Sequence, residues 1–308
     1  MKLTWIDTHI HLSDIGPDGC PRPDFMAALE HLLDSSDADL RLIASCDGPD
    51  MGRMRDDPDA ILAGNRFIHD VCRHFPGRVF GACTINPRWA AASAQAVDRC
   101  FGDWGFVMLG EMLPYCHHYV MDSDDAAALV RQATGYQVPV QVHLGTYCRP
   151  NQGFVPGDSM DGMGQLADLM ACARRVPEAR WILAHAIGRA PDPTFIPWAN
   201  MFLDAIFGTY GQFPDNFWIE IRDFYAQALP RTIREVPTAK LLAGTDWTTR
   251  VGPPFAPYGT CFEAGPGRNP FPPSVASFIG FLRAAGAGDA AIQAIACHNA
   301  QALFRLPN

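Results

Sequence analysis

Short apolar runs alternate with helix-length stretches along all 308 residues of the chain. Eight of these runs have the length and the apolar composition of strands that are buried on both faces. They span residues 3–10, 40–46, 78–85, 105–112, 138–144, 180–186, 217–222 and 240–246. The intervening segments include 24–34, 124–136 and 163–176, which have helical patterns, and a further helical pattern closes the chain at 290–304.

This order of elements predicts a fold. Eight strands with seven intervening helical segments and a closing helix favour an α/β protein, a parallel (β/α)8 TIM barrel that forms one domain over residues 1–308. The alternative is a doubly wound open sheet, which is disfavoured because no glycine-rich turn follows the first strand. The proline- and glycine-rich segment 250–274 is expected to be a long ordered loop after the eighth strand.

Composition limits the partners of the chain. The formal net charge of −9 argues against nucleic acid or an anionic membrane as a partner, and no apolar stretch approaches the length of a membrane span. The ten cysteines include no C-x-x-C pair, and the opening "MKLTWIDT" has no signal-peptide core, so we expect a cytoplasmic protein with reduced thiols. The sequence leaves open whether the chain forms a homo-oligomer.

Metal-competent side chains lie at the ends of the predicted strands. In "WIDTHIH", His9 and His11 are two residues apart, so they share one face of the first strand. That pair alone fits ordinary strand histidines equally well. Later strand ends add further metal-competent residues, namely Glu111, His143, His185 and Asp246.

The carboxyl ends of the strands meet at one mouth of a barrel, so these six side chains are expected to surround one site. Imidazoles and carboxylates that leave a position open for water suit a divalent metal ion. Zn²⁺ is the expected ion, and Mn²⁺ or Fe²⁺ would suit the same ligands. We expect the substrate to be a small molecule.

Several of these motifs also resemble a known family. The segments "DTHIH", "VHLG", "LAHAIG" and "AGTDW" resemble the amidohydrolase superfamily, and the closing "HNAQALFRL" resembles the ending of its amidohydrolase-related (type 2) branch. The resemblance implies that His9, His11 and Asp246 bind a metal ion, with His143 and His185 nearby. That branch contains both hydrolases and decarboxylases.

The number of metal ions stays open. Many two-metal members bridge their ions with a carbamylated lysine on the fourth strand, but Lys2 and Lys240, the only lysines, both lie at predicted strand starts. Glu111 in "MLGEMLPY" occupies the expected place and resembles the glutamate of the TatD-like branch. It either bridges two ions or orients a histidine beside a single ion.

The leading functional hypothesis is a metal-dependent hydrolase that uses a metal-activated water to cleave a lactone, ester or amide, with Asp246 and His185 as catalytic residues. The alternative is a metal-dependent, non-oxidative decarboxylase. A barrel without catalytic activity is disfavoured by the complete ligand set. Four arginines in or near the segments after strands five to eight could bind a carboxylate or a phosphate, so a carboxylate-bearing substrate is expected; they are Arg149, Arg189, Arg222 and Arg250. Trp247, directly after Asp246, is expected to form part of the pocket wall.

Overall fold

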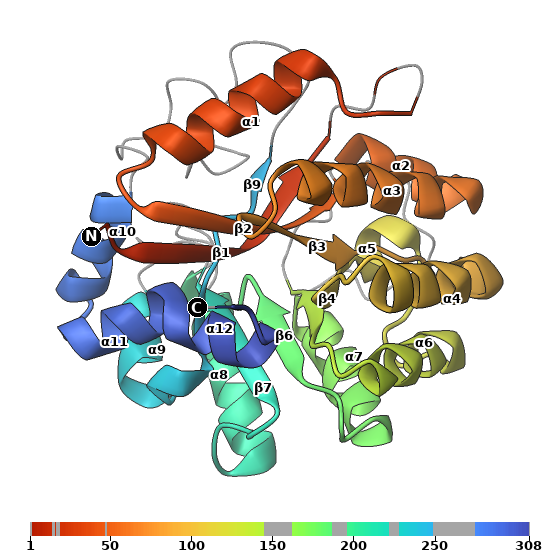
Figure 1. The fold of residues 1–308 in the computed structure, drawn as a ribbon. Coiled ribbons are helices and arrows are strands. Elements are labelled where there is room, and N and C mark those ends of the chain that lie inside the picture. Colours follow the sequence, from red (N-terminus) through yellow and green to blue (C-terminus); the bar gives the residue numbers. More distant parts are fainter. Residues whose placement is uncertain are drawn as a thin grey trace.

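Parallel strands form a nearly closed barrel with helices on its outer side (Figure 1). The computed structural model describes residues 2–13, 16, 19–46, 48–144, 162–186, 196–221, 228–248 and 275–307. Within these residues the chain forms one domain with the (β/α)8 TIM-barrel fold, so the predicted fold class is confirmed and the open sheet is excluded. The predicted loop 250–274 lies outside the described residues.

Each of the eight predicted strands is present, with ends shifted by at most a few residues. Neighbouring strands pair in parallel in the order β8-β7-β6-β5-β4-β3-β2-β1-β9. The strands are β1 (Thr4–Leu12), β2 (Asp39–Cys46), β3 (Val79–Cys83), β4 (Met108–Met112), β5 (Val140–His143), β6 (Trp181–Ala184), β7 (Phe217–Ile221), β8 (Leu241–Ala243) and β9 (Trp247–Thr248).

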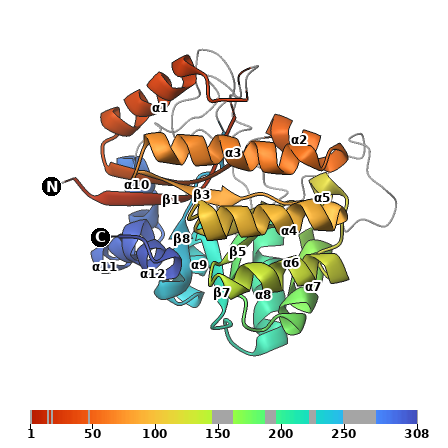
Figure 2. The ribbon, with the colours of Figure 1, turned by 45° about the vertical axis from the view of Figure 1, so that its right-hand side comes forward.

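Helices follow the strands and cover the outside of the barrel. Figure 2 shows α3 and α4 side by side outside β3. Among the described residues, no helix combines the length and the apolar character needed to span a membrane. The α-helices are α1 (Pro23–Ser35), α2 (Gly48–Asp56), α3 (Asp59–His74), α4 (Ala90–Asp98), α5 (Pro114–His117), α6 (Asp124–Gly135), α7 (Gly162–Arg175), α8 (Ile196–Tyr210), α9 (Leu229–Glu235), α10 (Val275–Ala284), α11 (Asp289–Gln293) and α12 (Asn299–Phe304).

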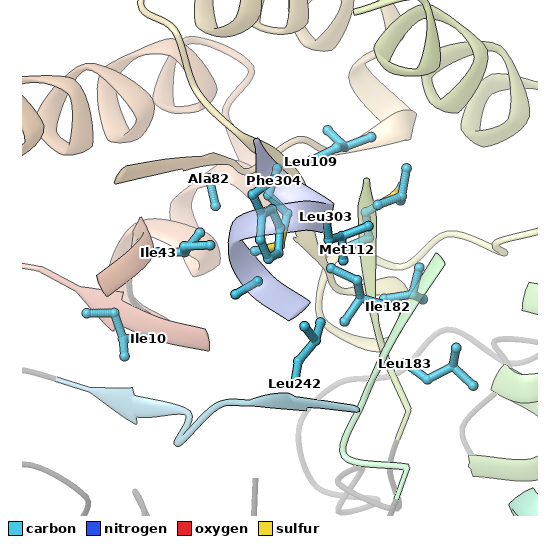
Figure 3. Packing of buried hydrophobic residues seen from close by; sticks show 14 of the residues in the cluster. Ile10, Ile43, Ala82, Leu109, Met112, Ile182, Leu183, Leu242, Leu303 and Phe304 are labelled. Atoms are coloured by element: carbon cyan, nitrogen blue, oxygen red, sulfur yellow. The ribbon is translucent and has the colours of Figure 1, made fainter. Parts of the chain in front are cut away.

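The apolar composition of the strands follows from their burial on both faces. Every residue of β6 and of β8 is buried, as expected for strands that face the barrel interior on one side and helices on the other. In Figure 3, Ile43 of β2, Leu242 of β8 and Phe304 of α12 belong to one hydrophobic cluster, together with side chains from the other strands. This continuous core holds the strand ends in fixed positions.

The closing helical segment covers the amino ends of the strands. It runs from α11 through a π-helical stretch (η5, Ala294–His298) into α12. The Asn299 amide donates hydrogen bonds to the carbonyls of Thr238 (2.7 Å) and Leu241 (2.8 Å), at the start of β8. Arg180, just before β6, donates to the carbonyl of Leu303 (2.8 Å). The closing helix therefore packs under the barrel, at the opposite end from the predicted site.

Buried polar contacts join the first strand to the eighth. The predicted eighth strand, 240–246, is strand only as β8, which pairs with β7; residues 244–246 are not strand, and β9 follows them and pairs with β1. The fully buried carboxylate of Asp7 accepts hydrogen bonds from the backbone N–H of His9 (3.0 Å), from that of Thr245 (3.1 Å) and from the Thr245 hydroxyl (2.5 Å). One side chain thus fixes the end of the eighth strand beside His9.

We expect Asp7→Ala to destabilise the protein by about 2–4 kcal/mol, because it leaves two buried N–H groups and a buried hydroxyl without their acceptor. The measurement is the midpoint of urea unfolding. Asp34→Ala, which removes only an exposed ion pair with Arg78, is the matched control and should leave the midpoint unchanged. Equal midpoints for the Asp7 and Asp34 variants would contradict this account of barrel closure.

Candidate metal centre

Two histidine rings from β1 converge at the carboxyl end of the barrel. The Nε2 atoms of His9 and His11 are 3.1 Å apart, and both side chains are buried. Nδ1 of His11 lies 2.8 Å from the Ser45 hydroxyl and 3.2 Å from the Cys46 carbonyl. Because a carbonyl only accepts, the proton of a neutral His11 belongs on Nδ1 and the Nε2 lone pair faces the site.

The His9 ring is oriented like that of His11, with Nδ1 directed away from the site and Nε2 directed into it. Its Nδ1 lies 2.8 Å from the carboxylate of Glu220, a fully buried residue of β7. An ionised carboxylate only accepts hydrogen bonds, so Nδ1 of His9 donates. Two neutral rings would therefore point lone pairs at each other across 3.1 Å. That arrangement is repulsive unless a cation lies between or beside the two nitrogens, and a metal ion meets this requirement.

Asp246 faces the same two nitrogens from the break between β8 and β9. Its Oδ1 lies 3.2 Å from Nε2 of His11 and 3.6 Å from Nε2 of His9. The residue has φ = 51°, and His185, directly after β6, has φ = 62°. Such left-handed conformations are uncommon for residues other than glycine and are concentrated at functional sites. Here they turn both side chains towards the barrel axis.

Glu111 of β4 lies between two pairs of histidines. Its Oε2 is 3.5 Å from Nε2 of both His9 and His11. Its Oε1 is 3.1 Å from Nδ1 of His143 and 3.1 Å from Nε2 of His185. Each carboxylate oxygen therefore serves a different pair, which is the arrangement of a carboxylate that can bridge two cations.

The donor atoms fit a divalent metal ion. Imidazole nitrogens and carboxylate oxygens are the ligands preferred by Zn²⁺, Mn²⁺ and Fe²⁺ in proteins. In the described part of the chain, three sets of residues have ligand atoms within 4.8 Å of one another; they are His9–His11–Asp246, Glu111–His143–His185 and His9–His185–Glu220.

The buried carboxylates favour the protonated forms of the two histidines on β1. Burial alone would lower the pKa of His9, but Glu220, Glu111 and Asp246 raise it well above its ordinary value. The pKa of His11 rises to about 9, since its hydrogen bonds to Asp246 and Glu111 outweigh the effect of burial. Protons thus occupy the metal-free site at neutral pH, and a metal ion must displace them.

The pKa values of His143 and Glu111 are both lowered, which leaves the histidine neutral and the glutamate ionised. Burial lowers the pKa of His143 to about 4, so this ring is neutral. Burial would raise the pKa of Glu111, but the charge of His9 and hydrogen bonds from His11 and His143 hold it well below its ordinary value. Glu111 is therefore an ionised carboxylate, which is the form needed for a bridging ligand.

The six residues predicted as metal ligands lie together at one end of the barrel. Lys2 and Lys240 lie away from them, since their Nζ atoms donate to the carbonyls of Ser36 and Asp215. Trp247 lies in β9 opposite Ile10. The four arginines predicted to bind substrate lie outside the described residues; they are Arg149, Arg189, Arg222 and Arg250.

Two neighbours of the site were not anticipated from the sequence. Glu220 is a lone acid in an otherwise apolar strand, and buried acids of this kind usually have a specific partner, so the signal was present in residues 217–222. Tyr115 of α5 lies against His143, with ring centroids 4.4 Å apart. No pattern in the sequence distinguishes Tyr115 from the other aromatic residues that follow strands.

We expect the affinity for a divalent ion to rise with pH up to about 9, because below the raised pKa of His11 the ion competes with a proton. At lower pH a larger fraction of the histidine is protonated, and the bound proton weakens binding of the ion. Chelator competition with Zn²⁺ at several pH values measures this. His11→Ala should bind much more weakly, whereas the control His298→Ala, exposed on the closing segment, should match the wild type. A pH-independent affinity would contradict the expectation.

Comparison with known proteins agrees with this architecture. Solved structures that share the fold at low identity include the following three. A 2,6-dihydroxybenzoate decarboxylase from Rhizobium is 17% identical, with a TM-score of 0.65 over 99% of each chain. A 5-carboxyvanillate decarboxylase from Novosphingobium aromaticivorans DSM 12444, complexed with manganese and 4-hydroxy-3-methoxy-5-nitrobenzoic acid, is 14% identical, with a TM-score of 0.65 over 99% of this chain and 96% of that one. A 4-oxalomesaconate hydratase from Rhodopseudomonas palustris is 14% identical, with a TM-score of 0.64 over 98% of this chain and 95% of that one.

Comparison of the sequence itself decides the family. No curated protein matches the chain significantly. The family described as Amidohydrolase matches residues 6–306, which is nearly the whole chain. The chain therefore belongs to the amidohydrolase family and is a metal-dependent enzyme of that superfamily.

Proposed function

We propose that this enzyme is a hydrolase that cleaves a lactone, ester or amide bond of a small molecule with a metal-activated water. The observation that carries the proposal is the position of Glu111, whose two carboxylate oxygens face opposite histidine pairs. An anionic bridge allows two cations to share a buried site, and two-metal sites are common in enzymes that hydrolyse such bonds.

The distances suggest how the ligands divide. His9, His11 and Asp246 would hold one ion, and His143 and His185 would hold the second, with Glu111 shared. Zn²⁺ remains our expected ion. Mn²⁺ is the principal alternative, since similar solved structures contain manganese. A divalent ion at this place makes bound water more acidic and polarises the carbonyl that is attacked.

Asp246 is the best-placed proton acceptor. Its side chain is 14% exposed, whereas that of Glu111 is 3% exposed, so Asp246 is the carboxylate nearer to the open mouth of the barrel. Its Oδ2 lies 4.0 Å from Nε2 of His185. Asp246 would take a proton from the attacking water and return it to the leaving group. His185, on the other side of that carboxylate, would help to hold it in place.

Substrate recognition is proposed to come from the loops after strands five to eight. Arginines in or near these loops would bind a carboxylate of the substrate through paired N–H groups, and Trp247 would form part of the pocket wall. The proposed residues are Arg149, Arg189, Arg222, Trp247 and Arg250. Six cysteines of the described part form no disulfide, which supports the further proposal of a cytoplasmic location; they are Cys72, Cys83, Cys100, Cys116, Cys172 and Cys297.

A non-oxidative decarboxylase is the second candidate. The observation in its favour is that a 2,6-dihydroxybenzoate decarboxylase and 5-carboxyvanillate decarboxylases are among the similar solved structures. A screen of lactones, esters, amides and aromatic carboxylates separates the two candidates. Hydrolysis in ¹⁸O-labelled water places the label in the product at the cleaved bond, whereas decarboxylation releases carbon dioxide from the substrate.

We expect Asp246→Asn to keep most of the bound metal but to lower turnover by about a hundredfold or more, because the amide keeps an oxygen ligand and loses the base. Metal content and turnover are measured on the same sample. Asp204→Asn, an exposed carboxylate paired with Arg231, is the control and should behave as the wild type. Wild-type turnover in Asp246→Asn would rule out its role as proton acceptor.

We expect Glu111→Gln to reduce the metal content from about two ions per chain towards one, because two cations repel without the shared anion. Elemental analysis of the purified protein gives the stoichiometry. Glu235→Gln, which alters a carboxylate that forms an ion pair with Arg231 on α9 and contacts none of the proposed ligands, should keep the wild-type content. One ion in the wild type, unchanged by Glu111→Gln, would refute the bridge and favour the decarboxylase.

A further inference from the structure

A carboxylate lies on the edge of the His9 ring that faces away from His11. Glu220 belongs to β7 and is fully buried, and its Oε2 lies 2.8 Å from Nδ1 of His9. The opposite ring nitrogen, Nε2, faces His11, Glu111 and Asp246. His9 is thus held between a carboxylate from the middle of a strand and the cluster at the strand ends.

We propose that Glu220 is a positioning residue for His9, one that orients the ring and keeps its proton on Nδ1 so that the Nε2 lone pair is available to the ion. This inference rests on the proposed metal site and adds a residue to it. A histidine that donates to a carboxylate is a stronger metal ligand, because its ring is fixed in one tautomer and made more electron-rich.

The neighbouring strand leaves room for this carboxylate. Gly244 follows β8, and a Cβ atom there would lie 2.5 Å from Cγ and 2.7 Å from Oε1 of Glu220. Real Cβ atoms do not approach other atoms so closely. Gly244 is therefore needed for space beside Glu220, which explains the glycine of "AGTD" in the sequence.

The fold alone does not account for a charge at this position. A buried carboxylate is costly unless it is paired. In the described part of the chain the ion-pair partner of Glu220 is His9, and its Oε1 has no hydrogen-bond partner there. A glutamine or an apolar residue would fill the same space at lower cost. The charge is explained by the histidine that it holds.

Zn²⁺ binding by the full-length chain tests the inference. Glu220→Gln preserves size and removes the charge, and it should bind Zn²⁺ about 10- to 100-fold more weakly in chelator competition. The thermal midpoint of the metal-free protein should fall by less than the loss of affinity, because the glutamine amide oxygen still accepts a hydrogen bond from Nδ1 of His9. Glu220→Asp keeps the charge but is one methylene shorter, so it should also bind weakly. Gly244→Ala, which crowds Glu220 without replacing it, should weaken binding as well.

A second readout reports on the ring itself. In Zn²⁺-loaded protein with ¹⁵N-labelled histidine, the wild type should show an Nδ1–H proton of His9 shifted downfield by its hydrogen bond to the carboxylate, and Glu220→Gln should lose that shift. Glu178→Gln, an exposed carboxylate after α7, is the matched control and should retain both the affinity and the signal.

The outcomes separate this inference from the proposed function. If the wild type binds Zn²⁺ and His11→Ala does not, the metal site stands. In that case a wild-type affinity in Glu220→Gln overturns the inference, and so does a wild-type affinity in Glu220→Asp, which would show that charge without position suffices. A loss of metal-free stability equal to the loss of affinity would indicate a purely structural residue. If His11→Ala binds as the wild type does, the metal site itself is wrong.

Discussion

The two Nε2 atoms of His9 and His11, 3.1 Å apart, impose the constraint on which the site depends. Each ring donates from Nδ1, so both lone pairs point inwards, and the carboxylates of Glu111 and Asp246 add negative charge beside them. The two lone pairs repel each other as long as both rings are neutral and both Nδ1–H groups keep their acceptors. A cation relieves this repulsion, and the neighbouring carboxylates raise the pKa of both histidines, which favours a proton in this place when no metal ion is bound.

The barrel provides the stiffness that keeps such unfavourable contacts in place. Asp7 ties β1 to the end of the eighth strand through three buried hydrogen bonds, and Asp246 donates its backbone N–H to the carbonyl of His9 at 2.8 Å. The left-handed turn at Asp246 is therefore held on both sides. Strain of this kind costs about 1–3 kcal/mol and persists only where the surrounding structure enforces it.

The sequence predicts the barrel because strands buried on both faces carry a strong apolar signal at regular intervals. It predicts the metal-ligand candidates because polar residues at the ends of such runs stand out. It marks Glu220 as a lone acid in an apolar strand but does not give its role, because that role depends on which ring lies against it in the barrel. The sequence also does not predict the break of the eighth strand at Asp246, because a single left-handed residue does not alter the pattern of apolar residues.

The position of Glu111 connects the charge of the site to its chemistry. A carboxylate that only oriented one histidine would need one oxygen near one ring. Glu111 instead places Oε2 near His9 and His11 and Oε1 near His143 and His185. Its low pKa keeps it ionised in spite of burial. In the metal-free protein the protonated histidines balance this negative charge, and a bound ion would take the place of their protons. Ion binding to the folded chain would therefore add to its stability, with the buried carboxylates balanced by protons in one state and by the ion in the other.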